Sequence, residues 1–446
     1  MSAEVRDDEV VALLQDLIRN RCVNDGSVAS GQEVASAGRI AALLEEAGAD
    51  YESYEPEPGR VSLVSRIEGS DPEAPSLCYL GHTDVVPVNE SAWERDPFAA
   101  ELVDGEVWGR GAVDMLNLTS SMSLAFARLA RSGFRPKGTL VLAAVADEEA
   151  LGTHGASYLS SRASDAVSTD YLLTEFGGLP LEMAGRKLIP VPVAEKGSCW
   201  CRLRVSGEPS HASMPLRTDN ALVNAAGVVS RLASFSPRPE IGETWRAFVE
   251  ASGFDAAMQD QLVDPERIDG LLASLPDLGL ARQAHACTHT TVAPTIAHGG
   301  SKINIIPDSV EIDVDIRTMP GWTEQDVRQL IAEAVGELMA KVEIVEMHDD
   351  PPTASPSETP LWAALEKVTA RAHPDGKMIP FLMTGATDAR FFRRLGTVCY
   401  GFGAFSDRIP FGQFARMFHG HNERVDVESL ALSAEAFEQL ARDFLS

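Results

Sequence analysis

The chain has 446 residues, of which 44% are hydrophobic and 23% are charged, and its formal net charge is −28 at pH 7. This composition excludes a disordered chain and is typical of a soluble globular protein with two or three domains. The acidic balance excludes nucleic acid as a partner, because phosphate binding needs a basic surface, and it requires that any anionic substrate be held by a few placed cations.

The first part of the chain alternates predicted helices and strands. Hydrophobic periodicity places them, in chain order, at 8–20 (helix), 35–47 (helix), 61–67 (strand), 76–82 (strand), 121–133 (helix) and 138–146 (strand). The last of these strands is apolar almost throughout, which is typical of a strand buried on both faces in a parallel sheet. We therefore predict an α/β domain.

Near residue 196 the pattern changes to β-α-β-β-α-β. Its elements are predicted at 199–205, 220–235, 291–300, 309–319, 323–339 and 342–348. This order predicts a ferredoxin-like α+β unit. A stretch rich in Pro, Asp and Gly at 235–285 interrupts the unit as an insertion, and the Pro/Ser-rich segment 349–360 is predicted to be a linker.

Elements of the first kind resume after this linker. The simplest architecture that accounts for this order is one α/β domain, made of residues 1–196 and 349–446. It is interrupted by an inserted α+β domain at 197–348.

The N-terminal sequence and the cysteines favour a cytoplasmic protein. MSAEVRDDEVVALL lacks the basic start and apolar core of a signal peptide. No apolar run approaches the roughly 18–20 residues of a membrane helix, so no membrane partner is expected. The six cysteines contain no CxxC pair, which favours reduced thiols over disulfides.

Side chains that can bind metal ions follow or adjoin the predicted strands. They are His82 and Asp84 after one strand, Asp147, Glu148 and Glu149 after the next, Glu175 after YLLT, Asp114 in the glycine-containing turn VWGRGAVDM, and His419 in MFHGHNE. The carboxyl ends of parallel strands meet at one edge of a sheet, where α/β proteins place their ligands. Confined carboxylates repel one another, so we expect cations there. Imidazole and carboxylate together suit Zn²⁺, and the number of acids favours two ions about 3.5–4 Å apart over a single ion.

Eight motifs together resemble metallopeptidase family twenty. They are, in chain order, GHTDVVP, GRGAVDM, ADEEALG, GEPSHASMP, GGSKINIIPD, DIRTMPG, GATDAR and HGHNE. The resemblance covers essentially the whole chain, and the family includes aminoacylase, glutamate carboxypeptidase, acetylornithine deacetylase and succinyl-diaminopimelate desuccinylase. It implies a zinc-peptidase-like catalytic domain with a mainly parallel sheet, interrupted by a lid that also forms the contact of a homodimer.

The resemblance also implies the roles of the site residues. The ligands of two zinc ions, with Co²⁺ or Mn²⁺ as alternatives, are His82, Asp114, Glu149, Glu175 and His419. Asp114 is implied to bridge the ions and to precede a cis peptide bond with Met115. Asp84 is implied to hold His82 in the ligating tautomer, and Glu148 to be the general base. His421 is an alternative to His419, although the apolar residues before His419 favour the latter.

Four further residues are implied to contact the substrate. His211 is implied to stabilise the oxyanion from the second subunit of the dimer, Asn304 and Arg317 to hold a substrate carboxylate, and Gly385 to provide a backbone contact in the same pocket. Two departures from the family pattern remove no ligand: Leu116 and Asn117 follow Met115 in place of the usual Lys, and the second Gly of DEExGG is out of register.

The implied activity is hydrolysis of an amide bond in a small N-acyl amino acid or short peptide with a free carboxylate. Glu148 takes a proton from water and returns it to the leaving amine, while Asp147 points away on an extended backbone and is structural. Three alternatives remain: a dipeptidase or desuccinylase of the same mechanism, a hydrolase with one metal or another metal, and a binding or assembly protein without catalysis. The insertion at 235–285 is expected to enlarge the lid, which favours aminoacylase or carboxypeptidase.

Overall fold

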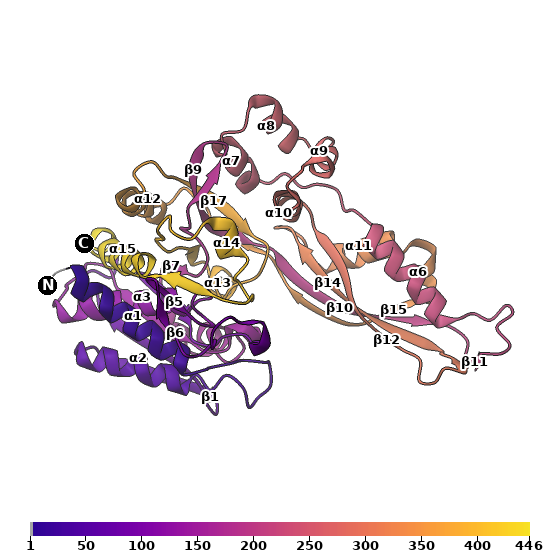
Figure 1. Cartoon of the computed structure of the whole chain (residues 1–446), viewed down its shortest axis with the longest axis horizontal. Helices are drawn as coiled ribbons and strands as arrows, with labels where there is room; N and C mark the ends of the chain where they lie inside the picture. The colour runs from indigo at the N-terminus through magenta and orange to yellow at the C-terminus, as the bar shows by residue number, and fades with distance from the viewer. Residues whose placement is uncertain (1–2) are drawn as a thin grey trace.

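The computed structural model describes residues 3–446, and its body carries a six-stranded sheet in the order β1-β2-β6-β3-β7-β18 (Figure 1). The strands are β1 (Tyr51–Glu57), β2 (Arg60–Ile67), β3 (Leu77–His82), β6 (Leu140–Val145), β7 (Tyr171–Thr174) and β18 (Val398–Gly401). The pairs that join β6, β3, β7 and β18 are parallel, as predicted. The hairpin β1–β2 runs antiparallel at one edge.

Helices cover both faces of this sheet, so alternate residues of a strand enter different cores. Leu140 and Leu142 of β6 belong to the larger core, whereas Val141 and Val145 belong to the smaller one. The larger core is covered by α1 (Ala3–Arg19), α2 (Val34–Glu46), α3 (Leu116–Arg131), α12 (Pro360–Ala372) and α15 (Val427–Phe444), and the smaller by α4 (Ala156–Arg162), α5 (Ser164–Val167) and α13 (Ala389–Arg393). Each aliphatic side chain buried in this way contributes about 1.5–3 kcal/mol.

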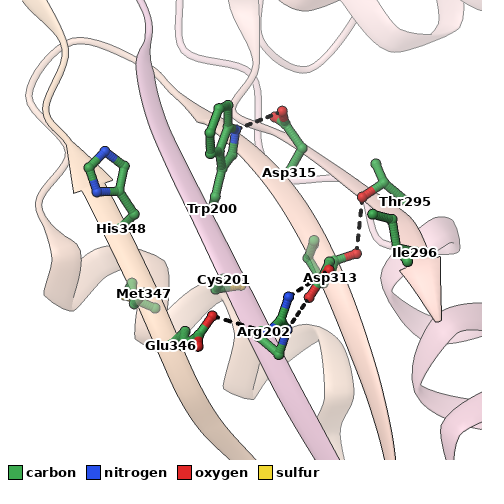
Figure 2. Close-up of a pocket in the computed structure, with 11 residues that line it drawn as sticks. Trp200, Cys201, Arg202, Thr295, Ile296, Asp313, Asp315, Glu346, Met347 and His348 are labelled. Atoms are coloured by element: carbon green, nitrogen blue, oxygen red, sulfur yellow. Dashed lines mark hydrogen bonds and ion pairs between the residues drawn. The ribbon is translucent and has the colours of Figure 1, made fainter. Parts of the chain in front are cut away.

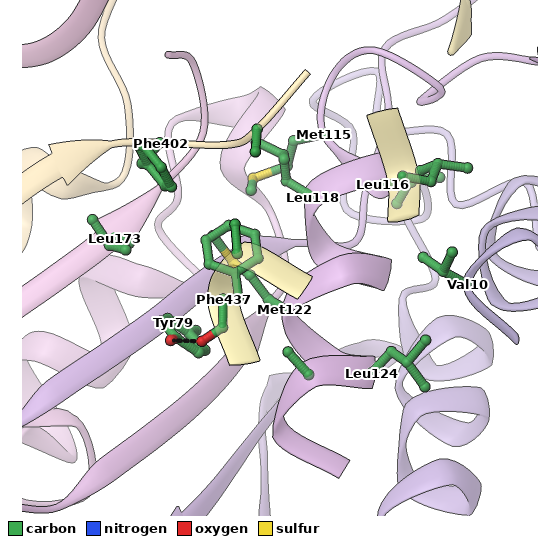
Figure 3. Close-up of a cluster of buried hydrophobic side chains, with 14 of the residues drawn as sticks. Val10, Tyr79, Met115, Leu116, Leu118, Met122, Leu124, Leu173, Phe402 and Phe437 are labelled. Carbon is green, nitrogen blue, oxygen red and sulfur yellow. Dashed lines mark hydrogen bonds between the residues drawn. The ribbon is translucent and has the colours of Figure 1, made fainter. Parts of the chain in front are cut away.

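The C-terminal helix α15 packs directly on the first part of the chain (Figure 3). The ring of Phe437 on α15 lies 5.1 Å from the ring of Tyr79 on β3, and the Tyr79 hydroxyl donates a hydrogen bond of 2.6 Å to the backbone oxygen of Phe437. Two segments that are far apart in the sequence therefore share one core, as the interrupted α/β architecture predicts.

Two smaller sheets complete the body. One contains β16 (Thr353–Ala354), β9 (Arg186–Glu195), β17 (Lys377–Met383) and β8 (Leu181–Met183), and the other contains β19 (Arg424–Asp426), β5 (Glu106–Trp108) and β4 (Leu102–Val103). The predicted linker 349–360 is therefore not a free linker, since its residues 353–354 pair with β9.

The inserted unit is a long arm that projects from the body (Figure 1). Its antiparallel sheet has the order β12-β14-β10-β15, which is the ferredoxin-like order predicted for β-α-β-β-α-β. The strands are β10 (Gly197–Ser206), β12 (Thr291–Gly299), β14 (Ser309–Thr318) and β15 (Val342–Asp350), and the helices on one face are α6 (Ala221–Ser234) and α11 (Glu324–Val335). The short pair β11 (Ser210–His211) and β13 (Ile305–Ile306) lies at the far end of the arm. We propose 197–348 as the limits of this domain, and β15 continues its sheet for two residues beyond them, to Asp350.

The segment 235–285 differs from its prediction, because it does not enlarge the arm. It forms the short helices α7 (Glu243–Ala251), α8 (Ala256–Leu262), α9 (Ile268–Ser274) and α10 (Leu278–Thr288). Trp245 and Phe248 pack in one core with Leu188 of β9 and Ile379 of β17, so the helices cover the body. The Asp residues that suggested a loop stand at helix starts, where the side chains of Asp255 and Asp277 cap α8 and α10.

None of the helices within residues 3–446 combines the length and the apolar character needed to cross a membrane.

Candidate active site

The strands β6, β3 and β7 are neighbours in the sheet, and acidic or imidazole side chains follow each of them at the same edge. His82 is the last residue of β3, Glu175 directly follows β7, and Glu148 and Glu149 lie three and four residues after the end of β6. Parallel strands bring these side chains together at the edge where α/β proteins bind ligands.

Two clusters of ligand atoms meet at Asp114. His82 Nε2 lies 3.3 Å from Asp114 Oδ1 and 3.7 Å from Glu175 Oε2. His419 Nε2 lies 3.2 Å from Asp114 Oδ2 and 3.1 Å from Glu149 Oε2. In each cluster one atom from each of the three residues lies within 4.8 Å of the others. Asp114 offers one oxygen to each cluster, and its peptide bond to Met115 is cis, as the sequence resemblance implies.

The charge balance of these clusters fits two cations. Burial and repulsion by Asp114 raise the pKa of Glu149, and the same two causes raise the pKa of Glu175 well above its ordinary value. Hydrogen bonds to Asp114 and Glu149 raise the pKa of His419 to about 10. Among the described residues, none offers a hydrogen bond to the buried oxygen Oε1 of Glu149. A buried carboxylate oxygen without a donor is costly, and a divalent ion removes that cost.

Asp84 contacts both the imidazole of the first cluster and the turn that carries Glu148 and Glu149. The ring nitrogen Nδ1 of His82 lies 3.0 Å from the backbone oxygen of Asp84 and 3.5 Å from its carboxylate. That carboxylate accepts hydrogen bonds of 3.1 Å from the backbone N–H groups of both Glu148 and Glu149. Asp84 therefore orients the imidazole as well as the two glutamates.

Asp147 faces away from the clusters, but not on the extended backbone that was expected. Its φ of 71° is in the left-handed region, and this turn starts the short 3-10 helix Glu148–Ala150. Its carboxylate accepts hydrogen bonds from Asn24 (3.1 Å) and from the backbone of His154 (2.9 Å). Asp147 thus fixes the turn that presents the two glutamates.

Glu148 lies beside both clusters and belongs to neither. It lines a pocket of about 250 Å³ together with Asp114, Glu149, Glu175 and His419. Burial and repulsion by Glu175 raise the pKa of Glu148 well above its ordinary value. A carboxyl group with a raised pKa beside such clusters is suited to proton transfer.

The predicted substrate contacts fall into two places. Arg317, on β14, and Gly385 line the same pocket as Glu148, and the Arg317 guanidinium donates to Asp315 at 2.8 and 3.0 Å. His211 and Asn304 are exposed and lie together at the far end of the arm, where the backbone N–H of Ala212 donates to the backbone oxygen of Asn304 at 3.1 Å (Figure 1). The structure does not bring these two residues to the pocket of their own chain.

Sequence reasoning missed several residues of the pocket. Buried Arg390 lines it and pairs with Asp350 at 2.7 Å. Nearby Asp388 is buried, and burial raises its pKa to about 7. Both residues stand in GATDAR, a motif in which only Gly385 was assigned a role. Their charge and their closeness to Gly385 in the sequence were the signal by which they could have been predicted.

The open face of the inserted sheet carries a second group of polar and aromatic side chains, which Figure 2 shows. A hollow of about 670 Å³ on this face is lined by Trp200, Arg202, Asp313 and His348, among others. Arg202 pairs with Asp313 at 2.6 Å. Trp200 and His348 are register partners on β10 and β15, and both also line the pocket. The hollow and the pocket are therefore neighbours along the arm.

Comparisons with known proteins found similar proteins that cover most of this chain. The chain matches the model of peptidase family M20/M25/M40 over residues 78–443. It is similar to the N-fatty-acyl-amino acid synthase/hydrolase PM20D1.1 of Danio rerio, at 29% identity over 83% of this chain and 73% of that protein. It is also similar to carboxypeptidase S of Saccharomyces cerevisiae, at 27% identity over 84% of this chain and 73% of that protein. Among solved structures, an M20 family metallo-carboxypeptidase of Sulfolobus solfataricus has the same fold, with a TM-score of 0.73, 17% identity, and coverage of 97% and 98% of the two chains.

Proposed function

Because the chain belongs to peptidase family M20/M25/M40, we propose that it hydrolyses the amide bond of an N-acyl amino acid or short peptide that carries a free carboxylate. The family and its hydrolase relatives make it a hydrolytic enzyme, so a binding protein without catalysis is no longer the alternative. The observation that carries the proposal is the pair of clusters that share Asp114 beside Glu148.

We propose that each cluster holds one divalent ion. The first ligand set is His82, Asp114 and Glu175, and the second is Asp114, Glu149 and His419. Mixed imidazole and carboxylate donors suit zinc, with Co²⁺ and Mn²⁺ as alternatives. When bound, the ions supply Lewis-acid polarisation of the substrate carbonyl and lower the pKa of water.

Glu148 is the group that moves protons in this proposal. Its carboxylate accepts a proton from the attacking water and passes it to the nitrogen of the leaving amine. Burial and repulsion by Glu175 raise the pKa of Glu148, and a higher pKa makes its carboxylate a stronger base toward the proton of water. Asp84 and Asp147 act as positioning residues, since they fix the turn from which Glu148 projects.

The purified enzyme is expected to contain two equivalents of metal, and chelation is expected to lower its melting temperature. Removing the ions restores the repulsion among the buried carboxylates, and a ligand at 100 times its Kd stabilises a folded protein by about 2.7 kcal/mol. Metal analysis and a thermal melt with and without chelator measure both effects.

His419→Ala and His421→Ala form a matched pair for this experiment, because His421 is exposed and belongs to neither cluster. The first variant should lose one equivalent and the second should keep both. Equal metal contents in the two variants contradict the ligand assignment.

We propose that Arg317 and the backbone of Gly385 hold the substrate carboxylate. Both line the pocket, and an Arg fork binds a carboxylate through two parallel hydrogen bonds. In a chain with a net charge of −28, such a local cation is needed to hold an anion.

Arg317→Met is expected to raise KM for carboxylate substrates by roughly 10- to 100-fold, since a hydrogen bond to a charged group contributes about 1.5–3 kcal/mol. Steady-state kinetics on a substrate and on its carboxamide analogue measure the effect, and the analogue should show little change. Arg328→Met is the control, because this side chain is partly exposed on α11 and does not line the pocket. A similar loss for both substrates argues against the carboxylate contact.

We propose that the enzyme is a homodimer formed through the arm, and that His211 and Asn304 complete the site of the partner subunit. Exposed apolar side chains on the arm support this contact: Leu222 and Val223 on α6, Ile296 on β12, and Met214, Leu216 and Ile303 near its far end. β12 is also an edge strand, with backbone groups available for pairing.

The cysteines support a reducing compartment, which we propose is the cytoplasm. All six are free and buried. Burial raises the pKa of the Cys22 thiol to about 11, and thiols of this kind are chemically inert.

A further inference from the structure

One buried side chain of the C-terminal segment holds the turn at 109–115, which carries Asp114. This turn is neither helix nor strand, so its buried backbone N–H groups need partners from elsewhere in the chain. The carboxylate of Glu423 is such a partner. Its Oε2 accepts hydrogen bonds from the backbone N–H groups of Gly111 (2.8 Å) and Val113 (3.4 Å). These contacts end one residue before the ligand that the two clusters share.

Glu423 also belongs to the segment that carries His419, which lies four residues before it. The backbone oxygen of Glu423 accepts a hydrogen bond of 3.0 Å from the N–H of Gly109. This contact extends the pairing of β5 with β19 by one step into the turn. Glu423 is therefore attached to the turn through its backbone and its side chain, and to His419 through a short stretch of chain.

Arg110 is the buried counter-ion of Glu423. Its Nη1 pairs with Oε1 of Glu423, and both side chains are buried. Its Nη2 donates a hydrogen bond of 3.3 Å to the backbone oxygen of Pro87, in the segment that follows His82. The buried pair therefore lies where the segments of three proposed ligands meet.

Stability alone does not account for this pair. A buried ion pair contributes little net stability, because the loss of solvation offsets its attraction. A second pair, Arg424 with Glu106 at 2.9 Å, already joins the same two strands. Both arginines that pair with Glu106, Arg408 and Arg424, lie outside the turn. What distinguishes Glu423 is its contact with the backbone that leads to the shared ligand.

We propose that Glu423 is a positioning residue for both metal clusters. Its carboxylate fixes the backbone before Asp114, and its own place in the chain fixes that turn relative to His419. Because Asp114 belongs to both clusters, a displaced turn weakens both metal sites at once. This inference rests on the proposed function, and it adds a residue outside the two ligand sets on which both ions depend.

The test is Glu423→Gln, since the amide has the size of the carboxyl group but only one acceptor oxygen. If that oxygen faces the turn, the amide nitrogen faces Arg110, and the reverse orientation turns the nitrogen toward the backbone N–H groups. Competition with a chelator should show that the affinity for both equivalents of Zn²⁺ is about 10- to 100-fold lower, as for other groups that orient ligands. The visible absorption spectrum of the protein saturated with Co²⁺ should also change, because it reports the geometry of the ligands.

Glu106→Gln is the matched control, because it makes the same change in the other pair between these strands. Its affinity for Zn²⁺ and its Co²⁺ spectrum should match those of the wild type, whatever its melting temperature. If Glu423→Gln does not fold, Glu423→Asp takes its place. This variant keeps the charge beside Arg110 but is one methylene shorter, and it should change the same two measurements in the same direction.

A Glu423→Gln protein with a lower melting temperature, but with wild-type affinity for both ions and an unchanged spectrum, overturns the inference, because the pair then stabilises only the fold. Loss of one ion alone overturns it too, and so does failure of both Glu423 variants to fold. A wild type that binds no divalent metal overturns the proposed metal sites, and this inference with them. A wild type that binds two ions and hydrolyses no amide overturns the proposed activity alone.

Discussion

Glu148→Gln is expected to lower kcat by about 10³-fold or more while both ions remain bound. The amide has the size of the carboxyl group but cannot accept and return a proton. Glu148 belongs to neither cluster of ligand atoms, so metal binding should not depend on it. The measurements are kcat at saturating substrate and the metal content of the same protein sample.

Glu149→Gln is the matched comparison, because it makes the same chemical change at the neighbouring residue. Oε2 of Glu149 lies 3.1 Å from His419 Nε2 in the second cluster, so this variant should lose metal at that site. The loss of activity in Glu149→Gln should be partly reversed by added metal, whereas that of Glu148→Gln should not. If both variants keep full metal content and similar residual activity, the two roles are assigned wrongly.

Co-expression of Glu148→Gln and His211→Ala chains is expected to restore activity that neither variant has alone. His211 lies at the far end of the arm, while every proposed ligand lies in the body (Figure 1). If His211 acts in the partner's site, a mixed dimer has both defects in one site and an intact second site. Random pairing makes half of the dimers mixed, so roughly a quarter of wild-type activity should return.

The two chains carry different tags, so that mixed dimers can be purified and assayed by themselves. Their activity should approach half of that of the wild-type dimer, because one of two sites is intact. If His211 serves its own chain, each site of the mixed dimer carries one defect. Mixed dimers that are no more active than the parent variants exclude sharing through His211.

The sequence predicts the parts of this fold that depend on local burial. The apolar residues Leu140–Val145 predict a buried parallel strand because helices cover both of its faces. The polar strand β1, YESYEPE, gives no such signal, since it lies at the sheet edge and none of its residues is buried. The helices of the segment 235–285 were not predicted, because the Asp residues that cap them are also typical of loops.

The residues of the candidate site are likewise predictable only where a local sequence pattern determines their position. His82, Glu149 and Glu175 could be placed together because each follows a strand of one parallel sheet. The sequence could not place Trp200 with them. This half-exposed residue lies on the arm, and it lines the pocket only because of how the arm is positioned on the body. Arg390 likewise depends on its pairing with Asp350, the last residue of β15.

The interrupted body has a consequence for the order in which the protein is made. Strands β17 and β18, the helix α15 and His419 all follow the arm in the chain, so a ribosome completes the arm before it supplies the rest of the body. Glu175 is synthesised about 240 residues before His419, an interval of roughly 10–50 s at about 5–20 residues per second. During this interval the nascent chain holds His82, Asp114 and Glu175 without the second imidazole, and β7 lacks its neighbour β18. If the two clusters bind ions as proposed, all ligands of the first are present during this interval, whereas the ligand set of the second is complete only when the C-terminal segment has been made.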